Sequence, residues 1–128
     1  MNSDSSVDPR YPHHPRRQLK RAQWVKLNGS WDYALTPLPD RLDAADPLAV
    51  ADPTDTPSVW DGVIEVPYSP EFPLSGVERT LTGDETLWYR RTFRLEPGPG
   101  ERVILHLDAV DQSCRIGVNG VDVCYHTG

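Results

Sequence analysis

Sulfur-bearing side chains are scarce in this 128-residue chain, which holds two cysteines and one methionine. Cys114 and Cys124 have neither the spacing of a zinc-binding pair nor that of a redox-active CxxC motif. Long apolar runs are also missing: none approaches the roughly 20 residues that span a membrane, and the N-terminus lacks the apolar segment of a signal peptide. We therefore expect a cytoplasmic protein with no membrane association, no metal site and no cofactor.

Basic residues are in short supply as well, because 13 lysines and arginines face 19 aspartates and glutamates, which gives a net charge of −6 at pH 7. An acidic domain is a poor binder of polyanions. The sequence therefore argues against nucleic acid as a partner, and we interpret the short basic cluster within residues 16–21 as a solvated linker.

Proline, by contrast, is abundant, with 13 residues that cluster in the N-terminal tail and in loops. Residues 1–19 are polar, contain Pro9, Pro12 and Pro15, and show no periodicity, which predicts a disordered N-terminal arm. The remaining residues 20–128 are enough for one domain with a modest core. Prolines in the later loops exclude long helices.

Alternation of apolar and polar residues, the pattern of half-buried strands, recurs beyond the arm. It predicts strands at 31–35, 63–66, 87–95 and 102–110, and a hairpin over 115–125. Proline-rich loops are expected at 40–58, with a short helical turn near 42–45, and at 68–85. Several short strands without a sustained helical pattern predict an all-β fold, an antiparallel β-sandwich.

Asn119-Gly120 lies between β-branched residues, which is a strong signal for a two-residue type I′ turn. Such a turn predicts three facing pairs: Val118 with Val121, Ile116 with Val123, and Cys114 with Tyr125. These six residues would form one apolar face. Cys124 would then lie opposite Arg115 and point to the other side, so we expect no disulfide between the two cysteines.

Four stretches carry a family resemblance. Residues 27–33 read LNGSWDY; Val66-Pro67 is followed at a distance by LSGV at 74–77; residues 87–93 read LWYRRTF; and residues 105–128 read LHLDAVDQSCRIGVNGVDVCYHTG. Together, in this order, they resemble the N-terminal part of glycoside hydrolase family 2, the family of β-galactosidases, β-glucuronidases and β-mannosidases. The resemblance covers nearly everything after the tail.

The resemblance implies a jelly-roll-like, galactose-binding-domain-like β-sandwich that is incomplete at its C-terminus. It implies that Trp31, Tyr89, Phe93 and Val118 are core residues. In this family the sandwich is completed further along the chain and is followed by an immunoglobulin-like domain and a (β/α)₈ barrel with two catalytic glutamates. We therefore expect a sugar-binding domain with no catalytic residues of its own, whose carbohydrate contacts arise in the intact enzyme, where it pairs with the remaining domains.

No pair of carboxylates in this chain suits glycoside hydrolysis, for which retaining enzymes need two carboxyl groups about 5–5.5 Å apart. Asp84 and Glu85 are adjacent and would point to opposite faces of an extended chain. The acidic cluster of Asp40, Asp43 and Asp46 lies in a proline-rich loop without a setting for a general acid. An enzyme that acts alone is therefore not expected.

Asp84 is the one candidate substrate-binding residue. In β-galactosidases of this family, the loop before the strand that matches Trp88-Tyr89 offers an Asn to the sugar, and Asp84 falls near that position. The Asp departs from the family pattern, because a carboxylate accepts hydrogen bonds from sugar hydroxyls but cannot donate as an amide does. The alternative is an ordinary exposed loop acid.

Two other functions stay open. A freestanding carbohydrate-binding module would use exposed aromatic rings to stack on sugars, and Trp24, Trp60 and Tyr68 lie in loop-like stretches that suit this role; alternatively these rings cap the ends of the sandwich. A non-catalytic interaction domain would pair with a complementary chain through an exposed sheet edge. If the sandwich is truncated, its half-covered apolar face predicts marginal stability or aggregation of the isolated chain.

Overall fold

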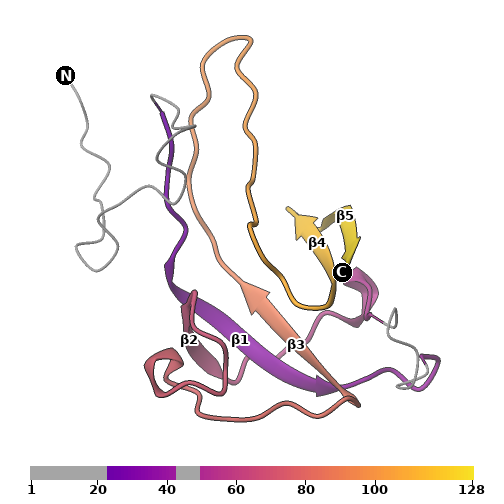
Figure 1. Ribbon diagram of the computed structural model, residues 1–128. Coiled ribbons are helices and arrows are strands. Elements are labelled where there is room, and N and C mark those ends of the chain that lie inside the picture. Colours follow the sequence, from indigo (N-terminus) through magenta and orange to yellow (C-terminus); the bar gives the residue numbers. More distant parts are fainter. Residues whose placement is uncertain (1–22, 43–49) are drawn as a thin grey trace.

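The computed structural model describes residues 23–42 and 50–128, and this part of the chain is all-β (Figure 1). Its elements, in chain order, are β1 (Gly29–Pro37), the short 3₁₀ helix η1 (Pro53–Asp55), β2 (Gly62–Val66), a second 3₁₀ helix η2 (Pro73–Ser75), β3 (Glu85–Arg90), β4 (Ser113–Val118) and β5 (Val121–Thr127). All strand pairs are antiparallel. The predicted all-β class is confirmed.

Strand β1 is the centre of a three-stranded sheet with the order β2-β1-β3. Its first half pairs with β2, so that Gly29 faces Val66 and Trp31 faces Ile64. Its second half pairs with β3, and Tyr33 lies opposite Tyr89. The ladder ends at Pro37, as expected for a residue that cannot donate a backbone hydrogen bond. The strands expected at 31–35 and 63–66 are therefore present.

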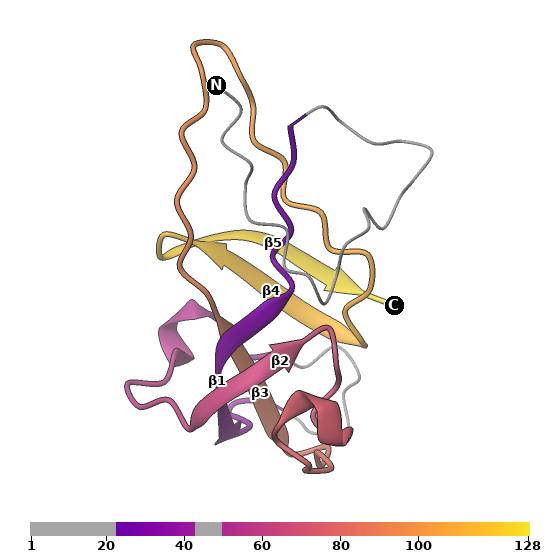
Figure 2. The same ribbon diagram turned by 90° about the vertical axis from the view of Figure 1, so that its left-hand side faces the viewer.

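Strands β4 and β5 form a second, two-stranded sheet, and Figure 1 shows this hairpin to one side of the three-stranded sheet, which Figure 2 shows from a perpendicular direction. Asn119 and Gly120 have φ values of 51° and 79°, the positive values that a type I′ turn requires at both central residues. The predicted turn is confirmed, and so is the pairing of Val118 with Val121.

The rest of the predicted hairpin register is wrong, because the pairing shifts by one residue at a β-bulge between Ile116 and Gly117. Beyond the bulge, Ile116 lies opposite Cys124, Arg115 opposite Tyr125, and Cys114 opposite His126. A one-residue slip moves every later side chain to the other face of the sheet. Tyr125 therefore leaves the expected apolar face and joins Arg115, whose guanidinium carbon lies 5.8 Å from the tyrosine ring centroid.

The same bulge changes the relationship of the two cysteines. Cys114 and Cys124 lie on the same face of the hairpin as diagonal neighbours, not on opposite faces as expected. Both are free thiols, so the expected absence of a disulfide agrees with the structure although its reason does not. Diagonal neighbours have Cα atoms roughly 7–8 Å apart, beyond the separation of about 4.4–6.8 Å that a disulfide usually spans.

The strands expected at 87–95 and 102–110 are the main departure from prediction. Strand β3 ends at Arg90, and residues 91–112 form a long extended arm without assigned strands until β4 begins (Figures 1 and 2). The predicted turn at the tip of the arm is present: Glu101 N donates to Gly98 O at 3.1 Å, and Gly100 has φ 76°. The arm leaves its apolar residues exposed, among them Phe93, Leu95, Val103, Ile104, Leu105 and Leu107.

The buried core is small. Its hydrophobic members in the described part are Ala34, Ala51 and Ile64, and Ser75, the last residue of η2, is also buried. The expected core positions Tyr89, Phe93 and Val118 are 41–42% exposed, so that prediction is wrong for these three, while Trp31 is half-buried. The physical reason is that, among the described residues, no second layer covers the arm or the hairpin. An alternating sequence pattern shows which side chains share a face, but it does not show whether another element packs on that face.

Some predictions lie outside the described residues, namely the arm at 1–19 and most of the helical turn near 42–45. Within the described residues, no helix has the length and apolar character that crossing a membrane requires.

Candidate functional site

The best-connected cluster of side chains lies where the chain enters β1 and leaves β3. The Trp31 indole Nε1 donates to the Leu27 carbonyl oxygen at 2.7 Å, which folds the segment before β1 back on the ring. The Arg91 Nη1 donates to the same oxygen at 2.6 Å and to the Asn28 carbonyl oxygen at 2.8 Å. The Arg91 guanidinium group thus binds two backbone carbonyl groups whose residues lie more than 60 positions earlier in the sequence.

Aromatic contacts complete this cluster, which we call the β1 entry clamp and define as Leu27, Asn28, Trp31, Tyr89 and Arg91. The rings of Trp31 and Tyr89 meet edge to face at 6.4 Å between centroids, and the Arg91 guanidinium carbon lies 5.9 Å from the Trp31 centroid. Partial burial raises the pKa of the Tyr89 hydroxyl above its ordinary value.

Gly29 sits at the bend of the entry clamp, where β1 begins. It is buried and has φ 110°, a backbone conformation that side-chain-bearing residues rarely adopt. The LNG-x-W stretch therefore has a structural basis: the glycine makes the bend, and the bend brings the Leu27 carbonyl to the Trp31 indole. Sequence reasoning assigned Trp31 to the core but missed the role of Arg91.

The opposite face of the three-stranded sheet carries charged and hydrogen-bonding side chains alongside the buried Ala34. Arg90 donates from Nε at 3.0 Å and from Nη2 at 2.8 Å to one Asp32 carboxylate oxygen, and its guanidinium carbon lies 4.2 Å from the Trp60 ring centroid. The Trp88 indole Nε1 donates to Thr36 Oγ1 at 2.8 Å. Arg90 therefore covers one face of the Trp60 ring, while Trp24 and Tyr68, the other predicted stacking residues, are half-buried.

Asp84, the predicted sugar contact, lies exposed in the loop that enters β3. Its carbonyl oxygen accepts from Leu38 N at 2.7 Å, and its carboxylate accepts a hydrogen bond from the Thr82 hydroxyl, which lowers the pKa of Asp84. The loop tip is therefore held by one hydrogen bond within the loop and by a second one to the residue that follows β1. Asp84 lies away from the entry clamp, at the opposite end of β3.

The carboxylate of Glu85, the neighbour of Asp84, has more interaction partners than the carboxylate of Asp84. Its carboxylate accepts from Thr82 N at 3.1 Å and pairs with Arg79, and the Thr82 backbone N–H is the main reason that the pKa of Glu85 is lowered. The carboxylates of Asp84 and Glu85 are therefore both ionised at neutral pH. That state is the opposite of what a general acid for glycoside cleavage needs.

The proline-rich loop contains a second charged cluster that the sequence did not predict. Arg41 pairs with Asp52 at 3.0 Å and with Asp55 of η1, and these bonds hold the pKa of Arg41 above its ordinary value. Of the acidic cluster considered above, Asp40 is exposed, whereas Asp43 and Asp46 lie outside the described residues.

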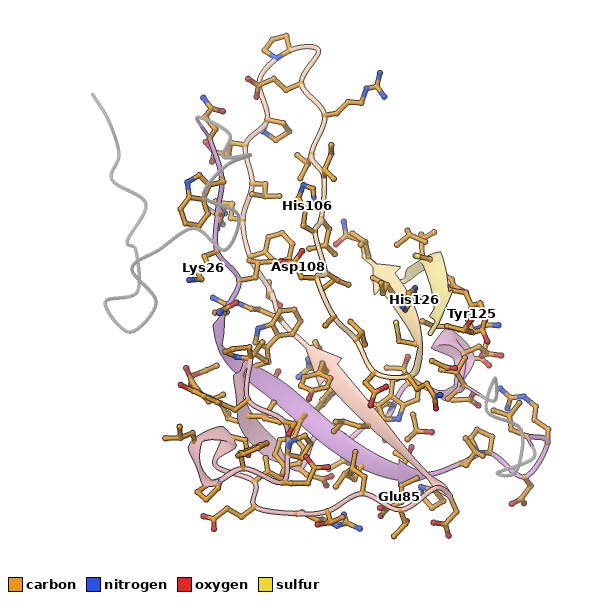
Figure 3. The ribbon with its side chains drawn as sticks, in the orientation of Figure 1. Lys26, Glu85, His106, Asp108, Tyr125 and His126 are labelled. Atoms are coloured by element: carbon orange, nitrogen blue, oxygen red, sulfur yellow. The ribbon has the colours of Figure 1, made fainter. Side chains whose placement is uncertain are left out.

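Titratable side chains are dispersed over the molecule rather than gathered at one place. Figure 3 shows Glu85 at the lower end of the three-stranded sheet, His106 and Asp108 on the extended arm, and His126 on the hairpin. Across residues 23–42 and 50–128, no group of three or more His, Cys, Asp or Glu side chains is placed to hold a metal ion.

Comparison with known proteins adds no family assignment: no protein-family model matches the chain, and no curated protein matches its sequence.

Proposed function

We propose that the chain is the N-terminal sugar-binding domain, or a part of it, of a glycoside hydrolase family 2 enzyme, and that it contributes architecture rather than catalysis. The parent enzyme would hydrolyse O-glycosidic bonds in the cytoplasm, with a β-galactoside or β-glucuronide type of substrate. The proposal depends on the resemblance of four sequence stretches and is supported by the way three of them meet in space.

The observation that carries the proposal is the β1 entry clamp together with its neighbour in β2. Residues 27–33 supply Leu27, Asn28 and Trp31, residues 87–93 supply Tyr89 and Arg91, and Val66 of the Val66-Pro67 pair lies opposite Gly29. Stretches that are far apart in sequence thus interlock around one bend. Such mutual contact gives a physical reason why they would occur together.

The jelly-roll-like sandwich is part of the same proposal. The two antiparallel sheets and the alternating arm at 91–112 supply the segments from which such a sandwich is built. Strands need a covered face to be stable, and the arm has none in the described part of the chain. We therefore infer that the arm completes its ladders when the remaining enzyme domains pack on it.

Asp84 is the proposed carbohydrate contact in the intact enzyme. Its carboxylate is exposed at a loop tip that Thr82 and Leu38 hold in place, so it is presented to whatever approaches that end of the sheet. An ionised carboxylate accepts hydrogen bonds from two sugar hydroxyls and donates none. In the intact enzyme, Asp84→Ala should raise KM, with Glu78→Ala, an exposed acid elsewhere in the preceding loop, as the matched control.

The experiment for the proposal begins with the DNA downstream of the gene, which should encode a (β/α)₈ barrel in the same or an adjacent frame. The chain should be produced alone and together with that barrel, and both preparations assayed on nitrophenyl β-galactoside, β-glucuronide and β-mannoside. We expect hydrolysis only when the barrel is present. Hydrolysis by the 128-residue chain alone, or the absence of any barrel-coding frame, overturns the proposal.

A freestanding carbohydrate-binding module is the second candidate, favoured by the Trp60–Arg90–Asp32 array. An aromatic ring beside a guanidinium–carboxylate pair offers both stacking and hydrogen bonds to a sugar. Titration calorimetry of the isolated chain with galactosides and glucuronides separates the two candidates. Binding that Trp60→Ala abolishes supports the module, while the absence of binding supports the enzyme fragment.

A further inference from the structure

The chain contains two Asn-Gly pairs in very different surroundings, Asn28-Gly29 and Asn119-Gly120. An Asn-Gly pair is chemically labile because glycine has no side chain to hinder attack by its backbone nitrogen on the asparagine side-chain amide. The reaction requires the peptide unit between the two residues to rotate. Whether a given pair reacts in a folded protein therefore depends on what holds that peptide unit.

At the first pair, the fold holds the peptide unit on both sides. The Asn28 carbonyl oxygen accepts the 2.8 Å hydrogen bond from Arg91, and Gly29 is buried and faces Val66 at the start of the β1–β2 ladder. Rotation would break the charged hydrogen bond and displace a buried residue. The β1 entry clamp therefore protects Asn28.

At the second pair, the described structure has neither a hydrogen bond like that of Arg91 nor a buried glycine. Asn119 and Gly120 are both exposed at the tip of the β4–β5 hairpin, and a Cβ added to Gly120 would meet no heavy atom within 4 Å. Within the described part of the chain, neither the Asn119 carbonyl nor the Gly120 N–H takes part in a hydrogen bond. The hairpin sheet has only two strands, and an isolated pair of strands is marginally stable in water.

We propose that Asn119 is a site of spontaneous deamidation in the folded protein, whereas Asn28 is protected. The Gly120 backbone nitrogen attacks the Asn119 side-chain carbon Cγ; the new N–Cγ bond closes a five-membered imide, the Cγ–Nδ2 bond breaks, and the proton of the attacking nitrogen leaves with the amide as ammonia. Water then opens the imide at either carbonyl, which gives aspartate or isoaspartate at position 119.

The two products differ in what they do to the hairpin. Aspartate followed by glycine still suits a type I′ turn, so the hairpin persists with one more negative charge. Isoaspartate adds a backbone methylene to a two-residue loop whose φ values are 51° and 79°, and the loop can no longer join Val118 to Val121 in register. Reaction at Asn119 thus acts as a slow, irreversible change in one of the two sheets. This inference does not depend on the proposed function.

The test incubates the folded 128-residue chain in mildly alkaline buffer and follows both sites by peptide mapping with mass spectrometry. Isoaspartate is detected separately with isoaspartyl methyltransferase. We expect Asn119 to react at least about tenfold faster than Asn28, the factor that ~1.4 kcal/mol of additional opening free energy at Asn28 gives. The same chain in denaturant is the control, and there the two rates should converge.

A pair of variants tests the protection itself. Arg91→Gln removes the hydrogen bond to the Asn28 carbonyl and should raise the Asn28 rate severalfold without changing the Asn119 rate, while Arg94→Gln, an exposed arginine of the same segment, should change neither. Circular dichroism identifies whether each variant is folded before its rate is interpreted. Equal rates at the two asparagines in the folded wild-type chain, or a faster rate at Asn28, overturn the proposal.

Discussion

The guanidinium group of Arg91 hydrogen-bonds two consecutive backbone carbonyl oxygens, those of Leu27 at 2.6 Å and Asn28 at 2.8 Å. This contact joins the segment that follows β3 to the segment that precedes β1, at a point where neither segment belongs to a strand ladder. The entry into the central strand is therefore held by the side chains of Arg91 and Trp31 rather than by sheet pairing.

Removing that side chain should destabilise the three-stranded sheet. Arg91→Ala leaves two carbonyls without their charged donor, and a hydrogen bond to a charged group contributes about 1.5–3 kcal/mol. We expect a fall of that order in the free energy of unfolding, measured from the midpoint and slope of urea unfolding. Arg94→Ala, in the exposed arm, should change it by less than about 0.5 kcal/mol. Equal effects of the two substitutions would show that the clamp does not stabilise the fold.

Ile64 is the largest hydrophobic residue that the described part buries completely, with 0% exposure. Ile64→Ala should cost about 2–5 kcal/mol because it removes transfer free energy and leaves a cavity in β2. With so few other core residues, a loss of this size should abolish cooperative thermal unfolding at neutral pH. The control is Val63→Ala on the same strand, where the side chain is 56% exposed and the expected change is within about 0.5 kcal/mol.

The parts of the fold that were predictable from sequence are those set by local chemistry. Alternation located β1 and β2, the prolines marked the ends of both, and Asn119-Gly120 fixed the turn between β4 and β5. Each of these signals acts between residues close together in the chain. Position 84 was likewise correctly expected in a loop before the β3 strand, although its role stays a prediction.

What the sequence could not supply depends on distant contacts. The bulge between Ile116 and Gly117 adds one residue to β5 and leaves no clear trace in the alternating pattern. The arm at 91–112 alternates as a strand does, yet it forms no ladder, and nothing in residues 23–42 and 50–128 covers it. The hydrogen bonds of Arg91 in the β1 entry clamp join positions more than 60 residues apart, and no local sequence signal assigned a role to this arginine.

The two thiols should differ in reactivity because of where the hairpin register places them. Cys124 is exposed, while Cys114 is half-buried, and its pKa is raised by burial and, to a smaller extent, by the nearby Cys124. Because the thiolate is the reactive form, Cys124 should react faster with an aromatic disulfide reagent at mildly alkaline pH. The measurement compares Cys114→Ser with Cys124→Ser, each keeping one thiol.

The same two cysteines provide a test of the bulged register. As diagonal neighbours they are too far apart for a disulfide without backbone movement, so mild oxidation of the folded chain should leave both free or join separate molecules through Cys124. Mass spectrometry of the monomer after oxidation decides the point. A Cys114–Cys124 bridge formed in the native state would contradict the register given for β4 and β5.

Acid should destabilise the loop before β3 and the loop that contains η1. The pKa of Glu85 is lowered mainly by the Thr82 backbone N–H, and that of Asp55 mainly by its hydrogen bond from Arg41. A carboxylate whose pKa is lower in the folded than in the unfolded chain stabilises the fold above the unfolded-state pKa, and this contribution is lost as the pH falls through the folded-state pKa. Stability should therefore decline below roughly pH 4.

Glu85 allows a more specific test of this acid sensitivity. Its ionised carboxylate, at the start of β3, accepts a backbone hydrogen bond and pairs with Arg79. Glu85→Gln should lower the urea midpoint at pH 7 and should flatten its dependence on pH between pH 7 and the acid limb. Glu96→Gln, an exposed acid near the tip of the arm, is the matched control and should leave the profile unchanged. If Glu85→Gln and the wild type lose stability in parallel as the pH falls, the Glu85 carboxylate is not a source of the acid sensitivity.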